Sequence, residues 1–222
     1  MGTAIANART HLARLRRPQV VWLSLLASMT LVGGGLVALE GPRSPRSDGL
    51  ALVAPGRTPS ATGIEAVFRT RSELDRDRWA RIVIHDSGSH YGSPESIASV
   101  HESRNMRGLG YHFVIGNGAG AGDGELFVGY RWLDQLPGAH AGGPDAEWHN
   151  QRAIGICLVG DGDRRPFSRA QMQRLADLVA ALSRELGIPA DQVVLHREIA
   201  PTSSPGRLFP ESALRERLLS LR

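Results

Sequence analysis

The sequence predicts an α/β domain in which helices flank a mixed central β-sheet. From about residue 64 onward, short apolar runs rich in β-branched residues alternate with longer segments of helical periodicity. A hydrophobic content of 41% supplies a substantial core, and a charged content of 22% argues against a disordered chain. The length of 222 residues suits one ordinary domain plus an appendage.

The expected strands fall into two groups. Three apolar runs bounded by polar residues predict buried strands at 81–85, 154–159 and 193–195. Residues 111–115 and 126–130 flank a connection rich in Gly and Asp, which predicts a hairpin with a long loop.

Three segments carry helix signals. Residues 94–104 begin with a proline and place apolar side chains on one face. Ser168 and Gln171 have the spacing of a capping box ahead of a long amphipathic helix, which Gly187 ends. A closing helix is expected at 212–219, so helices interleave with strands along the whole domain.

The front of the chain differs from the rest in composition. Residues 19–39 contain no charge, and about 20 such residues in a helix span the roughly 30 Å hydrocarbon core of a bilayer. Arginines cluster within 1–18, so the positive-inside rule places that segment in the cytoplasm and the remainder outside. We therefore expect a single-pass anchor in the cytoplasmic membrane. A cleaved signal sequence, which would give a secreted protein, is the alternative.

Residues 40–63 are rich in Pro, Ser and Gly and predict a flexible linker. The folded domain is expected at 64–222.

Charge is concentrated at the front of the chain. The first fifty positions hold six of the 26 basic residues and two of the 22 acidic residues, so the rest of the chain has twenty of each sign. The neutral domain argues against nucleic acid as a partner, although the chain's pI is about 10.1. The only cysteine, Cys157, excludes an intramolecular disulfide and is expected in the core.

Six short motifs occur in a fixed order over about residues 65–218. They are Ile-Val-Ile-His-Asp-Ser, Gly-Tyr-His-Phe-Val-Ile, Asp-Gly-Glu-Leu-Phe-Val-Gly-Tyr, Gly-Ala-His-Ala, Ile-Gly-Ile-Cys-Leu-Val-Gly-Asp and His-Arg-Glu-Ile-Ala-Pro-Thr-Ser-Ser-Pro-Gly. Together they resemble the zinc-amidase domain shared by bacterial N-acetylmuramoyl-L-alanine amidases, phage T7-type lysozymes and animal peptidoglycan recognition proteins. The resemblance implies that fold and peptidoglycan, or its muropeptides, as the partner; we expect a monomer.

The resemblance also assigns roles to individual residues. It implies that His85 and His196 bind Zn²⁺, as neutral imidazole nitrogens commonly do. Tyr111 matches a tyrosine that assists at the tetrahedral intermediate, and Thr202 matches a position near the same oxyanion. The implied reaction is hydrolysis of the amide that joins N-acetylmuramic acid to L-alanine. The alternative explanation of Tyr111 is a packed aromatic whose hydroxyl has a hydrogen-bond partner.

Ser204 departs from the family pattern. It stands eight residues after His196, where relatives place a cysteine or an aspartate as the third zinc ligand. A serine hydroxyl is neutral at pH 7 and is not a usual zinc ligand, so Zn²⁺ is expected to bind weakly or not at all. The alternative function is therefore a catalytically weak or inactive muropeptide-binding protein. Recruitment of Ser203 or Asp86 as a replacement ligand is left open.

Three further residues are candidates for substrate contact. His140 matches a position that lines the family's groove, and Asn150 lies in a stretch that resembles the family's Gly-x-Asn before the core strand. Trp132 is expected to form an apolar wall for glycan or peptide. Two of them have a structural explanation as well, because Asn150 suits a turn and Trp132 would anchor a loop.

Overall fold

The computed structural model describes residues 49–52 and 61–220. The expected cytoplasmic segment 1–18 and the expected membrane segment 19–39 lie outside the described residues. Within the part of the chain that is described, no helix has both the length and the apolar character needed to span a bilayer.

A six-stranded mixed sheet forms the centre of the domain. Its strand order is β1-β4-β3-β5-β2-β6. β4 pairs antiparallel with β1 and β3, whereas β3, β5, β2 and β6 pair in parallel. The strands are β1 (Leu50–Leu52), β2 (Arg81–Asp86), β3 (Phe113–Ile115), β4 (Leu126–Val128), β5 (Ala153–Leu158) and β6 (Val193–Leu195). The predicted hairpin is the β3–β4 pair.

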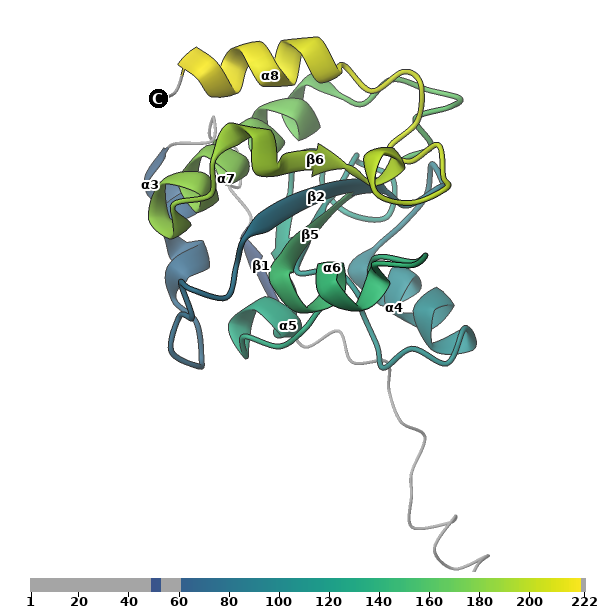
Figure 1. Cartoon of the computed structure of the whole chain (residues 1–222). Coiled ribbons are helices and arrows are strands. Elements are labelled where there is room, and N and C mark those ends of the chain that lie inside the picture. Colours follow the sequence, from purple (N-terminus) through teal and green to yellow (C-terminus); the bar gives the residue numbers. More distant parts are fainter. Residues whose placement is uncertain (1–48, 53–60, 221–222) are drawn as a thin grey trace, which may run out of the picture. The chain divides into compact units, whose positions relative to one another are not determined.

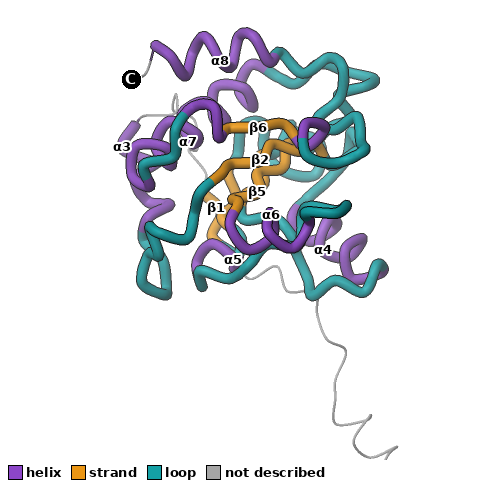
Figure 2. The backbone as a smooth tube through the Cα atoms, in the orientation of Figure 1, coloured by secondary structure: helices purple, strands orange, loops and turns teal. Residues whose placement is uncertain are grey.

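Helices flank this sheet, as the sequence predicts. In the orientation of Figure 1, α7 and α8 lie above the strands and α4 lies below them, and Figure 2 shows the strands enclosed by helices and loops. The helices are α3 (Ala61–Ile64), α4 (Pro94–Ser103), α5 (Tyr130–Leu133), α6 (Ala146–Arg152), α7 (Arg169–Leu186) and α8 (Glu211–Ser220), with 3-10 turns η1 (Glu65–Phe68), η2 (Ala190–Gln192) and η3 (His196–Glu198).

The long helix α7 begins and ends where its sequence signals indicate. The Ser168 side chain accepts a hydrogen bond from the Gln171 backbone N–H, and the Gln171 side chain accepts one from the Ser168 N–H, which completes the capping box. Gly187 ends the helix with a φ of +67°, a left-handed conformation that glycine adopts without strain. The apolar face of α7, including Leu178 and Leu182, is buried against the sheet.

The two faces of the sheet bury different clusters. Ile82 and Ile84 of β2 belong to the larger core, which α7 and α8 cover. Cys157 of β5 belongs to a smaller cluster that includes Ile97 of α4. His85 is the in-register partner of Cys157, and in-register residues of parallel strands point to the same face. The His85 side chain therefore emerges on the side of the sheet that α4 covers.

Three local features differ from the sequence-based expectations. The predicted strand 126–130 ends at Val128, because Tyr130 begins helix α5. Residues 50–52, inside the predicted linker 40–63, form β1 and pair with β4, which would otherwise be an edge strand. Helix α6 was not expected, since its seven residues are mostly polar and show no apolar stripe.

Leu178→Ala tests the core between α7 and the sheet. Leu178 is fully buried, so its truncation is expected to lower the free energy of unfolding by about 2–5 kcal/mol. Leu219→Ala is the matched control, because Leu219 is 63% exposed and should change stability by less than about 0.5 kcal/mol. Equal losses in chemical denaturation would contradict this packing.

Candidate active site

The parallel pairing of β2 with β6 brings two histidines together. Ile84 and Leu195 are register partners, so the residues that follow them, His85 and His196, lie side by side at the carboxyl end of the two strands. Their ring centroids are 4.2 Å apart. Ligand sites in α/β sheets are usually built at this edge.

Each of these two imidazoles has a buried nitrogen without a hydrogen-bond partner. The atoms are Nδ1 of His85 and Nε2 of His196. Burial lowers the pKa of His85 well below its ordinary value, and nearby histidines lower it further. Burial also lowers the pKa of His196, although the carboxylate of Asp86 partly opposes the shift. Two neutral rings with unpartnered nitrogens suit a divalent metal such as zinc, which binds the imidazole lone pair.

Ser204 lies beside this pair but presents no anion. Its hydroxyl oxygen accepts a hydrogen bond of 3.0 Å from the backbone N–H of Asp86, the residue after His85. Its carbonyl oxygen accepts another of 2.8 Å from the N–H of Arg197, the residue after His196. The described residues contain no group of three His, Cys, Asp or Glu side chains placed to hold a metal ion. The two imidazoles therefore offer two nitrogens to a metal ion, and the Ser204 hydroxyl beside them is neutral.

The two side chains considered as replacement ligands contact other partners. Oδ2 of Asp86 accepts a hydrogen bond of 3.0 Å from the backbone N–H of Gly162. The Ser203 hydroxyl donates to Oδ2 of Asp163. Among the described residues, Asp86 completes no three-ligand group with the histidines.

Tyr111 packs against His85, one member of this pair. Its ring centroid lies 5.1 Å from that of His85 and 5.2 Å from that of His101 on α4. Burial raises the pKa of the Tyr111 phenol well above its ordinary value, and Cys157 and Asp86 raise it further. The phenol therefore keeps its proton at neutral pH and is a hydrogen-bond donor on a ring that packs against His85.

Thr202 lies on the exposed loop after η3. Its hydroxyl oxygen accepts a hydrogen bond of 3.2 Å from the backbone N–H of Ser204. This contact connects Thr202 to Ser204.

His140 and Asn150, expected at the substrate, are connected to each other. Oδ1 of Asn150 accepts the backbone N–H groups of His140 and Ala141 at 2.8 and 3.0 Å. Asn150 thus stabilises the turn that carries His140. This contact agrees with the structural explanation of Asn150, a residue that suits a turn. His140 is 7% exposed, and Nδ1 of its ring lies 3.1 Å from Nε2 of His85. Burial lowers the pKa of His140 to about 3, so the ring is neutral.

The expectation that Trp132 lines a groove is wrong. Trp132 is fully buried in the larger core, where its ring packs against Phe113 and Trp79. Its indole N–H donates to the carbonyl oxygen of Val67 at 2.7 Å. A side chain with no exposed surface cannot form a wall for a ligand, and the anchoring explanation applies instead.

His149 was not among the sequence-predicted site residues. It lies on α6, is 5% exposed, and its Nδ1 has no hydrogen-bond partner. Charge on His149 would lower the pKa of His196, so the two rings share an electrostatic environment. The sequence offered no signal for this placement, because the helix that buries His149 was itself not predicted.

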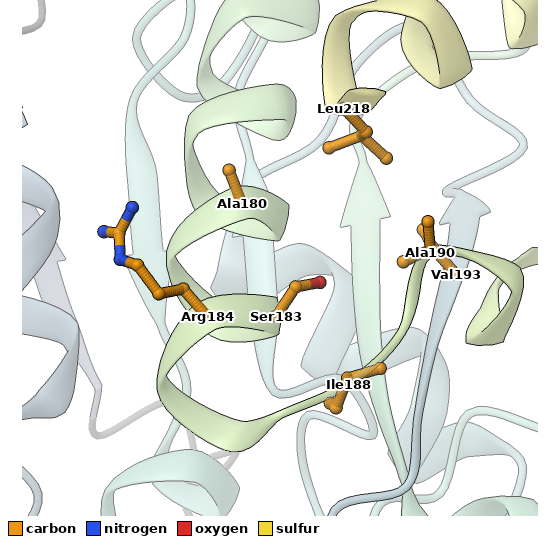
Figure 3. A pocket seen from close by; sticks show the side chains of 7 residues that line it. All are labelled: Ala180, Ser183, Arg184, Ile188, Ala190, Val193 and Leu218. Carbon is orange, nitrogen blue, oxygen red and sulfur yellow. The ribbon is translucent and has the colours of Figure 1, made fainter. Parts of the chain in front are cut away.

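A cavity elsewhere in the domain has a different character. It has a volume of about 300 Å³ and lies between α7, η2, β6 and α8. Figure 3 shows its side chains, which are mostly apolar apart from Ser183 and Arg184. None of the sequence-predicted site residues lines it. A smaller cavity of about 140 Å³, lined in part by Gly160 and Arg165, lies next to the end of β5.

Comparison with known proteins identifies the family. The family model described as N-acetylmuramoyl-L-alanine amidase matches residues 75–207, more than half of the chain. The chain belongs to this amidase family. Peptidoglycan recognition protein 1 of Mus musculus is 31% identical over 134 residues, which cover 56% of this chain and 68% of that protein.

Two further relatives are named as endolysins. The endolysin of Escherichia phage T7 is 33% identical over 113 residues, which cover 47% of this chain and 64% of that protein, so the match spans less than two thirds of the endolysin. A solved endolysin amidase from Clostridium intestinale URNW superposes with a TM-score of 0.56 at 26% identity. That superposition covers 68% of this chain and 90% of that one. This chain therefore has the amidase fold that its sequence predicts.

The buried His101 should make the stability of the fold depend on pH. Burial lowers its pKa to about 4, and Arg104 and Arg131 add to the shift, whereas an unfolded histidine titrates near 6.5. Between pH 6.5 and pH 4, His101 is protonated in the unfolded chain but not in the folded one. The free energy of unfolding should therefore fall as the pH falls from 6.5 toward 4, by at most about 1.4 kcal/mol per pH unit.

The matched variant is His101→Asn. Nδ1 of His101 accepts the Gly110 N–H at 2.9 Å, and an asparagine Oδ1 can accept the same bond without titrating. Thermal unfolding from pH 4 to 7 should show a shallower slope for the variant. Identical slopes for the two proteins would contradict the assignment.

Proposed function

We propose that this protein hydrolyses the amide between the lactyl group of N-acetylmuramic acid and L-alanine of the peptidoglycan stem peptide. The observation that carries the proposal is the pair of unpartnered imidazole nitrogens on His85 and His196, with the protonated phenol of Tyr111 beside His85. Membership of the amidase family supports the reaction, and relatives named as peptidoglycan recognition proteins support the substrate.

The proposed cofactor is Zn²⁺, with His85 Nδ1 and His196 Nε2 as its protein ligands. Zinc bound there would supply a Lewis acid for the scissile carbonyl and would lower the pKa of a bound water. At the third position, Ser204 offers a neutral hydroxyl whose oxygen already accepts the Asp86 N–H. Relatives with a thiolate or carboxylate gain an anionic ligand there, so this chain should bind zinc more weakly than they do.

The other proposed roles belong to groups that remain neutral. Tyr111 would donate its hydroxyl proton in a hydrogen bond to the oxyanion that develops on the scissile carbonyl. Its raised pKa keeps that proton available throughout the neutral range. Thr202, exposed at the rim and bonded to the Ser204 N–H, would contact the same oxyanion from the loop. The small cavity beside Gly160 would accept part of the muropeptide.

The second candidate function is recognition of muropeptides without cleavage. One observation favours it: the Ser204 hydroxyl has a backbone partner of its own and brings no charge to the histidine pair. A groove of this kind could bind substrate while holding too little zinc for hydrolysis.

The proposed location follows from the sequence alone. The uncharged segment 19–39 would anchor the protein in the cytoplasmic membrane, with the amidase domain on the outer side. A peptidoglycan-directed domain requires that side, and secretion after signal cleavage would also satisfy the requirement.

Ser204→Cys distinguishes the two functions. A thiolate at this position should raise zinc affinity and increase the release of L-alanine-terminated peptides from purified muropeptides. The matched control is Ser203→Cys, because Ser203 is adjacent and contacts Asp163 rather than the histidine side of the loop. Zinc content and cleavage are measured for the native protein and for both variants.

The outcomes separate clearly. Zinc binding and cleavage by the native protein support the amidase. Muropeptide binding without cleavage, with both zinc and cleavage gained in Ser204→Cys, supports the recognition function. The account of the site fails if neither protein binds zinc or muropeptide, or if Ser203→Cys gains as much as Ser204→Cys.

Tyr111→Phe tests the oxyanion donor. Loss of one such donor should reduce kcat by about 10²–10³-fold while leaving zinc content unchanged. Tyr91→Phe is the control, because Tyr91 is 67% exposed and lies outside the histidine cluster. An unchanged kcat in Tyr111→Phe would remove Tyr111 from the mechanism.

A further inference from the structure

The ring of His140 lies between His85 and the main chain of β5. Nδ1 of His140 is 3.1 Å from Nε2 of His85, and Nε2 of His140 is 3.1 Å from the carbonyl oxygen of Ala153. Both contacts are buried. Because a carbonyl oxygen can only accept a hydrogen bond, Nε2 of His140 must carry the ring proton.

The position of that proton determines the rest of the chain of contacts. A neutral imidazole has one ring proton, so Nδ1 of His140 is a hydrogen-bond acceptor. Its partner, Nε2 of His85, must then be the donor. His85 is neutral as well, which leaves its Nδ1 without a proton. This Nδ1 is the buried nitrogen that has no partner in the protein.

We propose that His140 is a positioning residue, which holds the ring proton of His85 on Nε2 and so leaves Nδ1 free to bind a divalent metal ion. The inference rests on the proposed function, since it assumes that His85 is a metal ligand. Histidine ligands usually donate their second N–H to a carboxylate, a backbone carbonyl or water. Here a second imidazole, fixed by the Ala153 carbonyl, takes that place.

The surroundings of His140 fix its ring in this position. A Cβ atom at Gly138 or Gly155 would lie 2.4 or 2.5 Å from carbon atoms of the ring, so both positions require glycine. The backbone N–H of His140 donates to Oδ1 of Asn150. The ring is therefore held from three sides while both of its nitrogens remain bonded.

His112, a neighbouring histidine, has a purely structural role and can be compared with His140. His112 is also fully buried, but its Nδ1 accepts the Gly155 N–H and its Nε2 contacts the Leu136 carbonyl oxygen. Both partners of His112 are backbone groups. His140 differs because one of its two partners is the imidazole of His85.

The first test is the ring tautomer of His85 in the metal-free, full-length protein. Histidine is labelled with ¹⁵N, and two-bond ¹H–¹⁵N spectra distinguish the protonated from the unprotonated ring nitrogen. We expect the proton of His85 on Nε2 in the native protein. A proton on Nδ1 would overturn the proposal without any variant being needed.

The second test compares two substitutions of His140. In His140→Leu the acceptor is lost, so His85 should become a mixture of tautomers and Zn²⁺ affinity should fall by about 10- to 100-fold. In His140→Asn, Oδ1 can stand in place of Nδ1 as an acceptor, so the tautomer and most of the affinity should return. Zn²⁺ alone is the probe, in competition with a chelator, in both the native and the Ser204→Cys backgrounds.

Two further variants guard against a trivial loss of folding. Gly155→Ala should displace the His140 ring without changing any imidazole, and it should alter the His85 tautomer in the same direction. His112→Asn should leave both the tautomer and the zinc affinity unchanged. Unchanged tautomer and affinity in folded His140→Leu, or equal effects in His112→Asn, would overturn the proposal.

This result is independent of the amidase reaction. If the native protein cleaves no muropeptide but His85 carries its proton on Nε2 and responds to His140→Leu, the proposed hydrolysis fails and the positioning role stands. If cleavage occurs while the tautomer of His85 does not depend on His140, the proposed hydrolysis stands and the positioning role fails.

Discussion

The parallel pairing of β2 with β5 and β6 is the constraint on which the rest of the site depends. It places β2, a strand with buried faces, inside the parallel half of the sheet, and His85 is the last residue but one of that strand. The same pairing sets His196 beside His85, although 111 positions of sequence separate them. The loop that follows η3 then returns Ser204 to the end of β2 through its bond with the Asp86 N–H.

Burial explains the electrostatic character of the site. Removal from water disfavours a charged imidazole, and this lowers the pKa of His85, His140 and His196. Neutral rings are competent metal ligands, but they contribute no charge to balance a divalent cation. Ser204, which contacts the residue after His85, adds no charge either, because its side chain is a hydroxyl. The site therefore combines a buried histidine pair with a neutral neighbour.

Much of the fold could be predicted from local sequence patterns. Buried strands such as 81–85, the hairpin, and α7 with its capping box and terminal Gly187 have signals that do not depend on distant contacts. β1 could not be predicted this way, because its strand conformation comes from pairing with β4. α6 was missed because a short polar helix has no periodic signal of its own.

Some parts of the candidate site could likewise be predicted from the sequence, and others could not. The motif resemblance indicated the proximity of His85, His196, Tyr111 and Ser204, and the structure brings them together. Local sequence could not show that Trp132 faces the core or that His149 is buried, since both depend on helices packing around the sheet. The hydrogen bond from His85 to His140 joins residues 55 positions apart and is visible only in the folded chain.

Diffraction at the zinc absorption edge, from crystals of the protein grown with Zn²⁺, tests the central claim most directly. The account predicts one anomalous peak at the end of β2 and β6, about 2.0–2.1 Å from His85 Nδ1 and His196 Nε2. The absence of a peak there, in crystals that contain zinc elsewhere, would contradict the view that this histidine pair is a metal site.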